Sequence, residues 1–335
     1  MELWKKFKQN PLVTTYLKPP IRGVKFLYKN WVGYPLGSAA ARRRHQEDLQ
    51  KTLNLEEGIN NLAERWPDIK SYCDANPVFI FSAGWRSGST LLQRLLMSSG
   101  NIIIWGEPYS EAGLIDYLSS PIKTIRAEYP WFASFLEDDT INDSDLVHKH
   151  IANLYPNMHY LMAAHISFFE TFFEKSAKDR GFGRWGIKEV RLEIEHAIYL
   201  NWLFPKAKFI FLYRNPYEAY NSYRKFYWYN RYPDDPVYTP KRFGLHWKSL
   251  LEGYLRGYQK VSSILIKYED LCQDDFDFKA LGEFVDLKID KNVLKTQVGS
   301  SIKWKADKIP IAERRILQRV VEPLASKLGY EYPTY

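Results

Sequence analysis

The stretch that most constrains the fold of this chain covers residues 77–97. It opens with an apolar run at residues 78–81, whose β-branched and aromatic side chains are typical of a buried strand. A loop rich in glycine and hydroxyl side chains follows at residues 84–90, and leucines then recur at helical spacing. This order of strand, small-residue loop and helix predicts an anion site, because the backbone N–H groups at a helix start point toward the ligand.

The loop carries the donors that a phosphate group needs. Its glycines let a ligand approach the main chain closely, its hydroxyl groups donate hydrogen bonds, and its arginine adds a positive charge. The residues that we expect to bind a phosphate or a phosphate-like group are Gly84, Arg86, Ser87, Gly88, Ser89 and Thr90. The pattern differs from the GxxxxGK[ST] loop of nucleoside triphosphatases, because Gly88 is followed directly by Ser89 with no lysine between them. A plain tight turn between strand and helix stays open as the simpler interpretation.

Further strand signals alternate with helical patterns along the rest of the chain. They lie at residues 102–105, 183–189, 209–213 and 262–268. Alternation of this kind predicts an α/β fold, with a P-loop-like parallel sheet and helices on both faces. We expect a single domain at residues 75–335, preceded by an N-terminal helical arm at residues 1–74.

The N-terminal arm is basic and aromatic over residues 1–45, and a helical pattern follows over residues 46–72. The whole chain carries a net charge of +8, which favours an anionic partner, although lysine-rich surfaces also serve solubility. The arm therefore suits either peripheral contact with an anionic membrane surface or packing on the main domain. Neither a signal peptide nor an apolar run long enough to span a membrane is evident. We therefore expect a cytoplasmic protein, with or without membrane attachment.

Charged and polar side chains follow several of the expected strands. Glu107 comes after the second strand signal, Lys188 ends the third, and Arg214 follows the fourth, with Ser222 two helical turns further on. Because ligands bind at the carboxyl ends of strands in open parallel sheets, we expect these side chains to face a site. Helix capping by Glu107, and surface ion pairs of Lys188 or Arg214, stay open as purely structural alternatives.

The helix after Arg214 has a clear sequence start. Asn215 is a favoured N-cap residue, and Pro216 suits the first helical position. Glu218 follows three residues after the cap, which is the spacing of a capping box. We therefore expect Asn215 and Glu218 to exchange hydrogen bonds at this helix start.

Aromatic residues make up 16% of the chain, which suits a protein that binds sugars, flat rings or membranes and equally suits a large core. Residues 223–232 interleave aromatic and basic side chains, as expected of a surface that stacks on bases or sugars or of an ordinary packed helix. The spacings of four histidines match neither a zinc finger nor HExxH, so we expect no metal site. These histidines are His148, His150, His159 and His165.

Several of these motifs together resemble a known family. Residues 86–92, RSGSTLL after a strand, are similar to the 5′-phosphosulfate loop of sulfotransferases that use 3′-phosphoadenosine 5′-phosphosulfate (PAPS). Residues 214–222 resemble the 3′-phosphate motif of that family, and residues 267–271 match its YEDL segment. The loop that closes over the nucleotide in Golgi-type members is similar to the segment holding Ser300, Ser301 and Lys303.

The resemblance implies a role for each motif. Such a protein would transfer a sulfuryl group from PAPS to a hydroxyl or, less readily, an amine acceptor, and would release adenosine 3′,5′-bisphosphate without using a metal. The phosphosulfate loop and the nucleotide-covering loop would bind the cofactor, and Arg214 and Ser222 would bind its 3′-phosphate. Arg86 and Lys188 would neutralise charge on the transferring group.

The resemblance also indicates which residue takes the acceptor proton. In tyrosylprotein and carbohydrate-type members the general base is a glutamate in a Gly-Glu context after the second strand, and Glu107 matches it. Cytosolic steroid and phenol sulfotransferases instead have a catalytic histidine two residues after a lysine. Here Lys188 is followed by Glu189 and Val190, so that histidine is absent. Glu189 is the second candidate for the base, and the chain lacks the membrane anchor and lumenal cysteines of the glutamate-base members.

The acceptor and two other functions stay open. The aromatic content leans toward a saccharide or glycolipid acceptor, while a tyrosine or a small alcohol is also compatible. A P-loop-type nucleoside or small-molecule kinase is the alternative enzyme, although the loop lacks the lysine of that class. A basic aromatic protein that binds nucleic acid through residues 223–232 is the alternative without catalysis, but we expect no nucleic-acid partner.

Overall fold

The computed structural model describes residues 53–107, 113–135, 147, 153–224, 237, 239–295 and 308–334. The predictions for residues 1–52, for His148 and His150, and for most of residues 223–232 lie outside these ranges. Three predicted cofactor-binding residues also lie outside them, namely Ser300, Ser301 and Lys303. Within the described ranges, no helix is both long enough and apolar enough to span a membrane.

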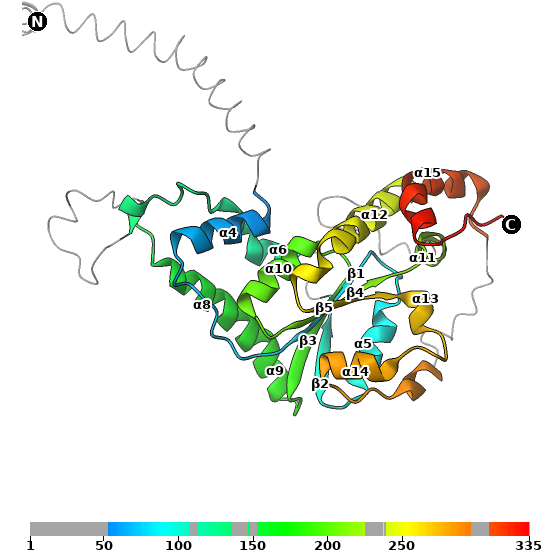
Figure 1. The fold of residues 1–335 in the computed structure, drawn as a ribbon, viewed down its shortest axis with the longest axis horizontal. Helices are drawn as coiled ribbons and strands as arrows, with labels where there is room; N and C mark the ends of the chain where they lie inside the picture. Colours follow the sequence, from blue (N-terminus) through cyan, green and yellow to red (C-terminus); the bar gives the residue numbers. More distant parts are fainter. Residues whose placement is uncertain are drawn as a thin grey trace, which may run out of the picture. The chain divides into compact units, whose positions relative to one another are not determined.

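A parallel sheet forms the centre of the described domain (Figure 1). In the described residues it has five strands in the order β2-β3-β1-β4-β5, and every neighbouring pair is parallel. This confirms the parallel α/β fold and the five strand signals of the sequence. The strands are β1 Val78–Ser82, β2 Ile102–Gly106, β3 Arg184–Glu189, β4 Lys208–Tyr213 and β5 Ser263–Lys267.

The central strands are buried on both faces because their apolar residues alternate between two separate parts of the core. In β1, Val78 and Ile80 pack on one face, whereas Phe79 and Phe81 pack on the other. In β4, Ile210 continues the aliphatic face, and the phenylalanines on either side of it join the aromatic face. One face of the sheet is therefore lined mainly by aliphatic side chains and the other largely by aromatic rings.

Helices cover both faces, as the alternating pattern predicts (Figure 1). The aliphatic face packs against three helices: α5 Ser89–Met97, α13 Tyr268–Leu271 and α14 Phe278–Val285. The aromatic face belongs to the larger core, to which the remaining α-helices contribute. These are α4 Leu55–Arg65, α6 Leu114–Ser119, α8 Met158–Phe169, α9 Lys175–Lys178, α10 Ile194–Leu203, α11 Pro216–Tyr223, α12 Pro240–Gly257 and α15 Ile311–Lys327.

Short helical turns complete the described secondary structure. A π-helical turn, η6, joins α8 to α9 and spans Glu170–Glu174. The 3-10 helices are η3 Ser120–Thr124, η4 Phe132–Ser134, η8 Tyr258–Lys260 and η9 Lys291–Lys295.

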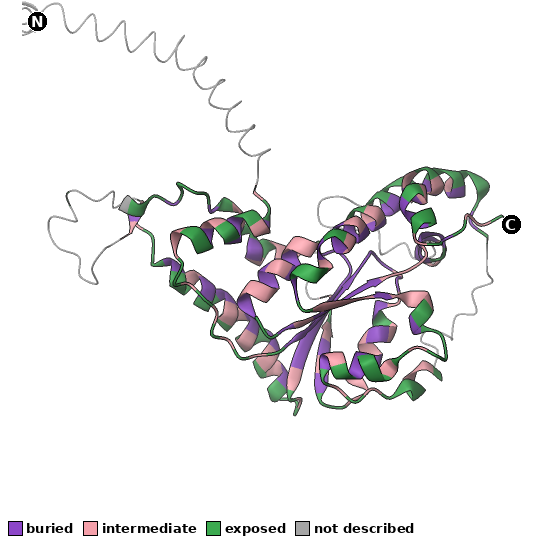
Figure 2. Ribbon diagram, viewed as in Figure 1, coloured by how far each residue is buried: buried purple, intermediate pink, exposed green. Residues whose placement is uncertain are grey.

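The aromatic face accounts for much of the aromatic content of the chain. Trp185 of β3 is 2% exposed and contacts rings from β1, α8, η6 and the segment after α10. The large rings in this part of the core are buried. Figure 2 shows that much of the length of the strands is buried as well. Burying one such side chain stabilises the fold by about 2 kcal/mol. The rings that contact Trp185 are Phe79, Phe169, Phe173 and Phe204.

The helix predicted over residues 46–72 is shorter in the structure where it is described. α4 ends at Arg65, and the residues after Trp66 are not helical. The physical reason is Pro67, since the residue before a proline is disfavoured in helical conformation. In this stretch Leu55, Ile59 and Leu62 are buried, whereas Leu53 and Trp66 are half-buried.

Candidate active site

The carboxyl ends of the five described strands meet at one edge of the sheet. β1 and β4 are neighbours there, but the chain leaves β1 for β2 on one side and leaves β4 for β5 on the other. Loops that diverge in this way leave a crevice at the strand ends, and open α/β proteins bind ligands in such crevices. The loop of residues 84–90, called the phosphate loop here after its predicted ligand, follows β1, and Arg214 follows β4, so both lie at this switch point.

The loop between β1 and α5 has an unusual backbone. Gly84, Arg86 and Gly88 have positive φ angles of 81°, 62° and 92°. Arg86 is the informative residue, because a side chain in this region costs about 1 kcal/mol and needs contacts that hold it there. Its backbone oxygen accepts a hydrogen bond from Arg214 Nη1 (3.1 Å), and its Nε donates to Ser222 Oγ (2.9 Å). Arg86 therefore ties the loop after β1 to the segment after β4.

Gly88 also allows a close approach at the start of α5. A Cβ atom at this position would lie 2.0 Å from the Tyr268 ring, so any other residue would displace that ring. α5 then begins at Ser89 with no side-chain cap, so its first N–H groups point to the switch point without a side-chain acceptor. Ser89 is buried and Thr90 is exposed.

Ser87 is turned into the loop. Its side chain is fully buried, and its hydroxyl group donates to Gly84 O (2.8 Å) and lies 2.6 Å from Ser82 Oγ. In the described geometry this hydroxyl therefore shapes the loop.

Arg214 approaches the loop from the end of β4. Its guanidinium carbon lies 4.5 Å from the centre of the Tyr268 ring, which is a cation–π distance. Its Nε is buried and has no hydrogen-bond partner in the part of the chain that is described. Because a buried charged donor without an acceptor is costly, this position favours an anionic ligand.

The turn from β4 into α11 confirms one half of the predicted capping box and corrects the other. Asn215 Oδ1 accepts hydrogen bonds from the N–H groups of Tyr217 (2.9 Å) and Glu218 (3.4 Å). The Glu218 side chain is exposed, and the Asn215 N–H donates instead to Glu269 Oε1 at 2.9 Å. Glu269 lies in the YEDL segment after β5, the strand next to β4, so a carboxylate from outside the helix completes the helix start.

An ion pair joins the ends of β2 and β3. Lys188 Nζ contacts Glu107 Oε1, because the register places Gly106 opposite Lys188 and Glu107 follows directly. The Lys188 side chain is 7% exposed, whereas that of Glu107 is 24% exposed. The carboxylate is thus the more exposed member of the pair.

The next residue of β3 forms a different ion pair. Glu189 contacts Arg191, with Arg191 Nε donating to Glu189 Oε2 at 2.9 Å, and it also accepts a bond from the Val190 N–H at 3.2 Å. Burial raises the pKa of the Glu189 carboxyl, and Arg191 opposes that rise. The carboxylate is already occupied by local partners, so this geometry favours Glu107 over Glu189 as the base.

A comparison with known proteins decides the family. The model of the sulfotransferase family matches residues 77–290, which include the phosphate loop, both ion pairs and the YEDL segment. The chain belongs to the sulfotransferase family.

Solved structures of other sulfotransferases are similar to this one at low sequence identity. The sulfotransferase domain from the curacin biosynthetic pathway is 15% identical, with a TM-score of 0.44, covering 77% of this chain and 99% of its own. A sulfotransferase from Alicyclobacillus acidocaldarius is 16% identical, with a TM-score of 0.39 and coverage of 77% and 97%. Sulfotransferase STF9 from Mycobacterium avium is 13% identical, with a TM-score of 0.39 and coverage of 82% for both chains. No curated protein sequence matches this chain.

Sequence reasoning missed the contribution of α12 to the site of this sulfotransferase. Trp247 Nε1 donates to Arg214 O (3.0 Å), and Tyr254 OH donates to Leu192 O (2.7 Å). His246 stacks on Trp85 of the phosphate loop, with ring centres 4.8 Å apart. Burial lowers the pKa of His246 to about 4. These residues follow the helical period of a buried helix face, so the sequence gives no signal that separates them from ordinary core positions.

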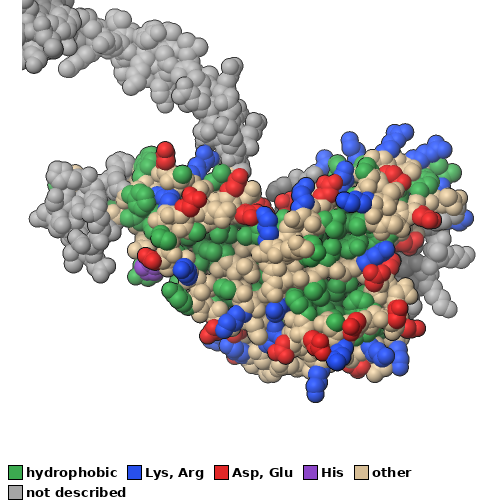
Figure 3. Space-filling view, in the orientation of Figure 1, with side chains coloured by type: hydrophobic (Ala, Val, Ile, Leu, Met, Phe, Trp, Pro, Cys, Tyr) green, Lys and Arg blue, Asp and Glu red, His purple; other side chains and the backbone are tan. Residues whose placement is uncertain are grey.

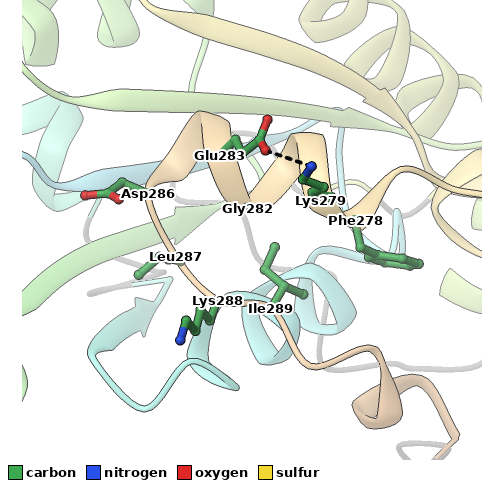
Figure 4. Close-up of a pocket in the computed structure, with 8 residues that line it drawn as sticks. All are labelled: Phe278, Lys279, Gly282, Glu283, Asp286, Leu287, Lys288 and Ile289. Carbon is green, nitrogen blue, oxygen red and sulfur yellow. Dashed lines mark ion pairs between the residues drawn. The ribbon is translucent and has the colours of Figure 1, made fainter.

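Other features of the domain lie away from the switch point. A hollow lined by α14 and the segment after it contains an ion pair between Lys279 and Glu283 (Figure 4). The end of α14 is bonded through its carbonyl groups to Arg184, the first residue of β3, and so lies near the opposite, amino edge of the sheet. Side chains of both charges are interspersed over the face of the domain shown in Figure 3. In the described ranges, no group of three or more His, Cys, Asp or Glu residues could hold a metal ion.

Proposed function

We propose that this sulfotransferase transfers the sulfuryl group of PAPS to a hydroxyl acceptor, or less readily to an amine, with Glu107 as the general base. The observation that carries the proposal is the contact between Lys188 and Glu107 at the sheet edge that also holds the phosphate loop and Arg214. A cation and a reachable carboxylate therefore lie at the same sheet edge as the loop that we propose binds an anion. That is the combination that transfer from a phosphate leaving group to a nucleophile needs.

The residues around the switch point fit the two phosphate-bearing ends of PAPS. The orphaned Nε of Arg214 and the hydroxyl group of Ser222 supply donors for the 3′-phosphate. The uncapped start of α5, together with Arg86, Gly84 and the exposed Thr90, supplies donors for the 5′-phosphosulfate, whereas the buried Ser87 hydroxyl contributes by shaping the loop. Ser300, Ser301 and Lys303, which lie outside the described ranges, belong to the proposal through sequence resemblance alone.

The proposed reaction is an in-line displacement at sulfur. The acceptor oxygen forms a bond to sulfur, the bond from sulfur to the bridging phosphate oxygen breaks, and adenosine 3′,5′-bisphosphate leaves. Glu107 takes the acceptor proton, which typically contributes 10²–10⁴-fold to the rate. Lys188 and Arg86 neutralise the charge that grows on the leaving oxygen. Because these cations supply the positive charge, the proposal includes no metal.

The acceptor is proposed to be a saccharide or glycolipid. Aromatic content supported that expectation in the sequence, and the structure uses many of the largest rings in the core. Rings that pack in the core do not bind an acceptor, so the aromatic content of the chain is weak support for a saccharide. A screen of acceptors is the test that identifies the substrate. A cytoplasmic location, and contact of the basic N-terminal arm with an anionic membrane, are further proposals from the sequence.

The first test separates this proposal from a kinase and from a nucleic-acid-binding protein. Adenosine 3′,5′-bisphosphate without magnesium is expected to raise the unfolding temperature more than ATP with magnesium does. Incubation with sulfur-labelled PAPS and a panel of sugars, glycolipids, phenols and amines then identifies the acceptor. Stabilisation by ATP with magnesium alone would favour the kinase. Salt-dependent binding of oligonucleotides without nucleotide stabilisation would favour the non-enzymatic function.

A further inference from the structure

The peptide unit between Arg214 and Asn215 is held at both ends by side chains from other elements. Its carbonyl oxygen, on Arg214, accepts a hydrogen bond from Trp247 Nε1 at 3.0 Å. Its N–H group, on Asn215, donates to Glu269 Oε1 at 2.9 Å. Trp247 lies on α12, which packs in the aromatic part of the core, and Glu269 lies on α13, which packs in the aliphatic part. Helices from the two parts of the core thus fix one peptide plane.

Both holding side chains are themselves fixed. The Trp247 side chain is 1% exposed and therefore cannot turn without disturbing the core. The second carboxylate oxygen of Glu269, Oε2, accepts a hydrogen bond from the Tyr330 hydroxyl group at 2.9 Å, and Tyr330 is 5% exposed. Two rigid partners with good geometry define the orientation of the peptide far better than one would.

The direction of this peptide determines where two ligand-binding side chains lie. Arg214 extends from one side of it, and Asn215 on the other side is the N-cap of α11. Ser222 lies near the end of that helix and accepts the hydrogen bond from Arg86 Nε. A rotation of the peptide would therefore move both Arg214 and Ser222 directly. It would reach the loop after β1 only through the two bonds of Arg86, because that loop also has internal bonds through Ser87.

We propose that Trp247 and Glu269 are positioning residues that set the selectivity of this enzyme for a 3′-phosphorylated nucleotide, by holding the Arg214–Asn215 peptide. The proposal rests on the proposed function, because Arg214 and Ser222 are assigned there to the 3′-phosphate. It adds that the selectivity depends on two side chains that do not themselves bind the nucleotide. When the backbone at an arginine is free to turn, both the backbone and the long side chain must be ordered on binding. The conformational entropy lost in this way lowers the affinity.

The test from the α12 side is Trp247→Phe, which removes the indole N–H and keeps an aromatic ring in the core. Binding of adenosine 3′,5′-bisphosphate and of adenosine 5′-phosphate is measured by calorimetry. We expect the bisphosphate affinity to fall about 3- to 10-fold, the range for one lost hydrogen bond, and the monophosphate affinity to change less than about 2-fold. Trp105→Phe is the matched control, because it removes an indole bond to Phe173 O (3.3 Å) at β2. It should leave the ratio of the two affinities unchanged.

The test from the α13 side is a pair of variants at Glu269. Glu269→Leu removes both acceptor oxygens and should lower the bisphosphate affinity selectively, by about 10-fold or more, because the lost acceptor is charged. Glu269→Gln keeps an oxygen that can accept the Asn215 N–H, and should restore most of the selectivity. Hydrogen exchange at the Asn215 amide gives a readout without nucleotide: exchange should be faster in Glu269→Leu than in Glu269→Gln.

The outcomes separate this inference from the proposed function. If the wild type does not prefer the bisphosphate, or Arg214→Ala does not reduce that preference, the proposed function fails and the inference fails with it. If Arg214→Ala reduces the preference but the Trp247 and Glu269 variants weaken both nucleotides equally, only the inference is overturned, because the two residues then have a general structural role. Should Trp247→Phe not fold, the comparison of Glu269→Leu with Glu269→Gln decides the question by itself.

Discussion

Lys188 and Glu189 are neighbours on β3, yet their ion pairs differ in nearly every physical respect. Lys188 lies beside Ile80 of the aliphatic face, Glu189 lies beside Phe81 of the aromatic face, and successive side chains of a strand point to opposite faces. The Lys188 pair spans two strands and reaches Glu107, which is 24% exposed. The Glu189 pair is local, and its side chains are only 5% and 4% exposed.

From this difference we assign catalysis to the Lys188–Glu107 pair and stability of the fold to the Glu189–Arg191 pair. A carboxylate that takes a proton from a substrate must be reachable and must be able to exchange its partner. Glu107 meets the first condition, and its partner Lys188 is a single point charge on a flexible stem. Glu189 is held by a guanidinium fork and a backbone N–H, so moving it would break a buried ion pair. The predictions below contrast the two pairs.

The largest expected effect is that of Glu107→Gln. The amide has nearly the same shape but cannot take the proton, so kcat should fall about 10²- to 10⁴-fold while adenosine 3′,5′-bisphosphate binds as before. Steady-state kinetics and calorimetry measure the two quantities, and Glu128→Gln, at an exposed glutamate, is the control for the chemical change. Turnover near the wild-type rate would show that Glu107 is not the base and would turn attention to Glu189.

The second prediction concerns the two cations that we propose flank the transferring group. Arg86→Ala and Lys188→Ala should each lower kcat by about 10- to 10³-fold, more than they raise the KM for PAPS. Because both act on one developing charge, the double variant should lose less than the product of the two single losses. Lys188→Arg should not rescue activity, since a planar fork does not replace a point charge. A rise in KM alone would reduce both residues to cofactor anchors.

The third prediction is that the buried pair of Glu189 and Arg191 contributes to stability rather than to turnover. Glu189→Gln breaks this buried ion pair, so the free energy of unfolding should fall by about 3 kcal/mol. The kcat per folded molecule should change only a few-fold. Urea unfolding measures the first quantity, and active-site titration with the bisphosphate corrects the second. A stable Glu189→Gln protein with no turnover would contradict the assignment of roles to the two pairs.

Much of the fold was predictable from the sequence because its signals are local. Each of the five strands is an apolar run bounded by polar residues, and each appears within two residues of its expected position. The loop between β1 and α5 was predictable for the same reason, since glycines and hydroxyl residues there separate an apolar run from a helical pattern. The end of α4 was missed because the helical pattern continues past Pro67, and there the backbone restriction overrides periodicity.

The site was less predictable wherever its contacts are distant in sequence. Asn215 and Glu218 have capping-box spacing, but strand order brings Glu269 beside Asn215, and the sequence does not state strand order. Trp247 lies on an amphipathic helix, where a buried tryptophan is expected in any case. The hydrophobic periodicity of the helix therefore does not reveal its hydrogen bond to Arg214 O. Ser87 was expected to face a ligand, but its hydroxyl group is turned inward and forms a hydrogen bond with Ser82 Oγ at 2.6 Å. The sequence gives no sign of this contact.

The smallest predicted effect concerns the titration of His246, which lies on α12 next to the end of β3. His246 Nε2 lies 3.4 Å from Val190 O, and its pKa is lowered to about 4 by burial, with a further contribution from the Arg191 charge. In the unfolded chain the pKa is about 6.5. Between these values the unfolded chain binds a proton that the folded protein does not bind, so the free energy of unfolding falls as the pH falls. The slope for this group alone is at most about 1.4 kcal/mol per pH unit.

His246→Gln removes this titration and keeps a polar side chain of similar reach. From pH 7 to pH 4.5, the wild type should therefore lose about 1–3 kcal/mol more stability than His246→Gln does. Glu189 has a raised pKa and contributes in the opposite direction, but it does so in both proteins, so the difference between their urea-unfolding curves isolates His246. Parallel pH profiles would mean that the imidazole accepts a proton in place. The buried side of β3 would then tolerate added positive charge beside Arg191, and its contrast with the open Lys188 side would be weaker than the two ion pairs indicate.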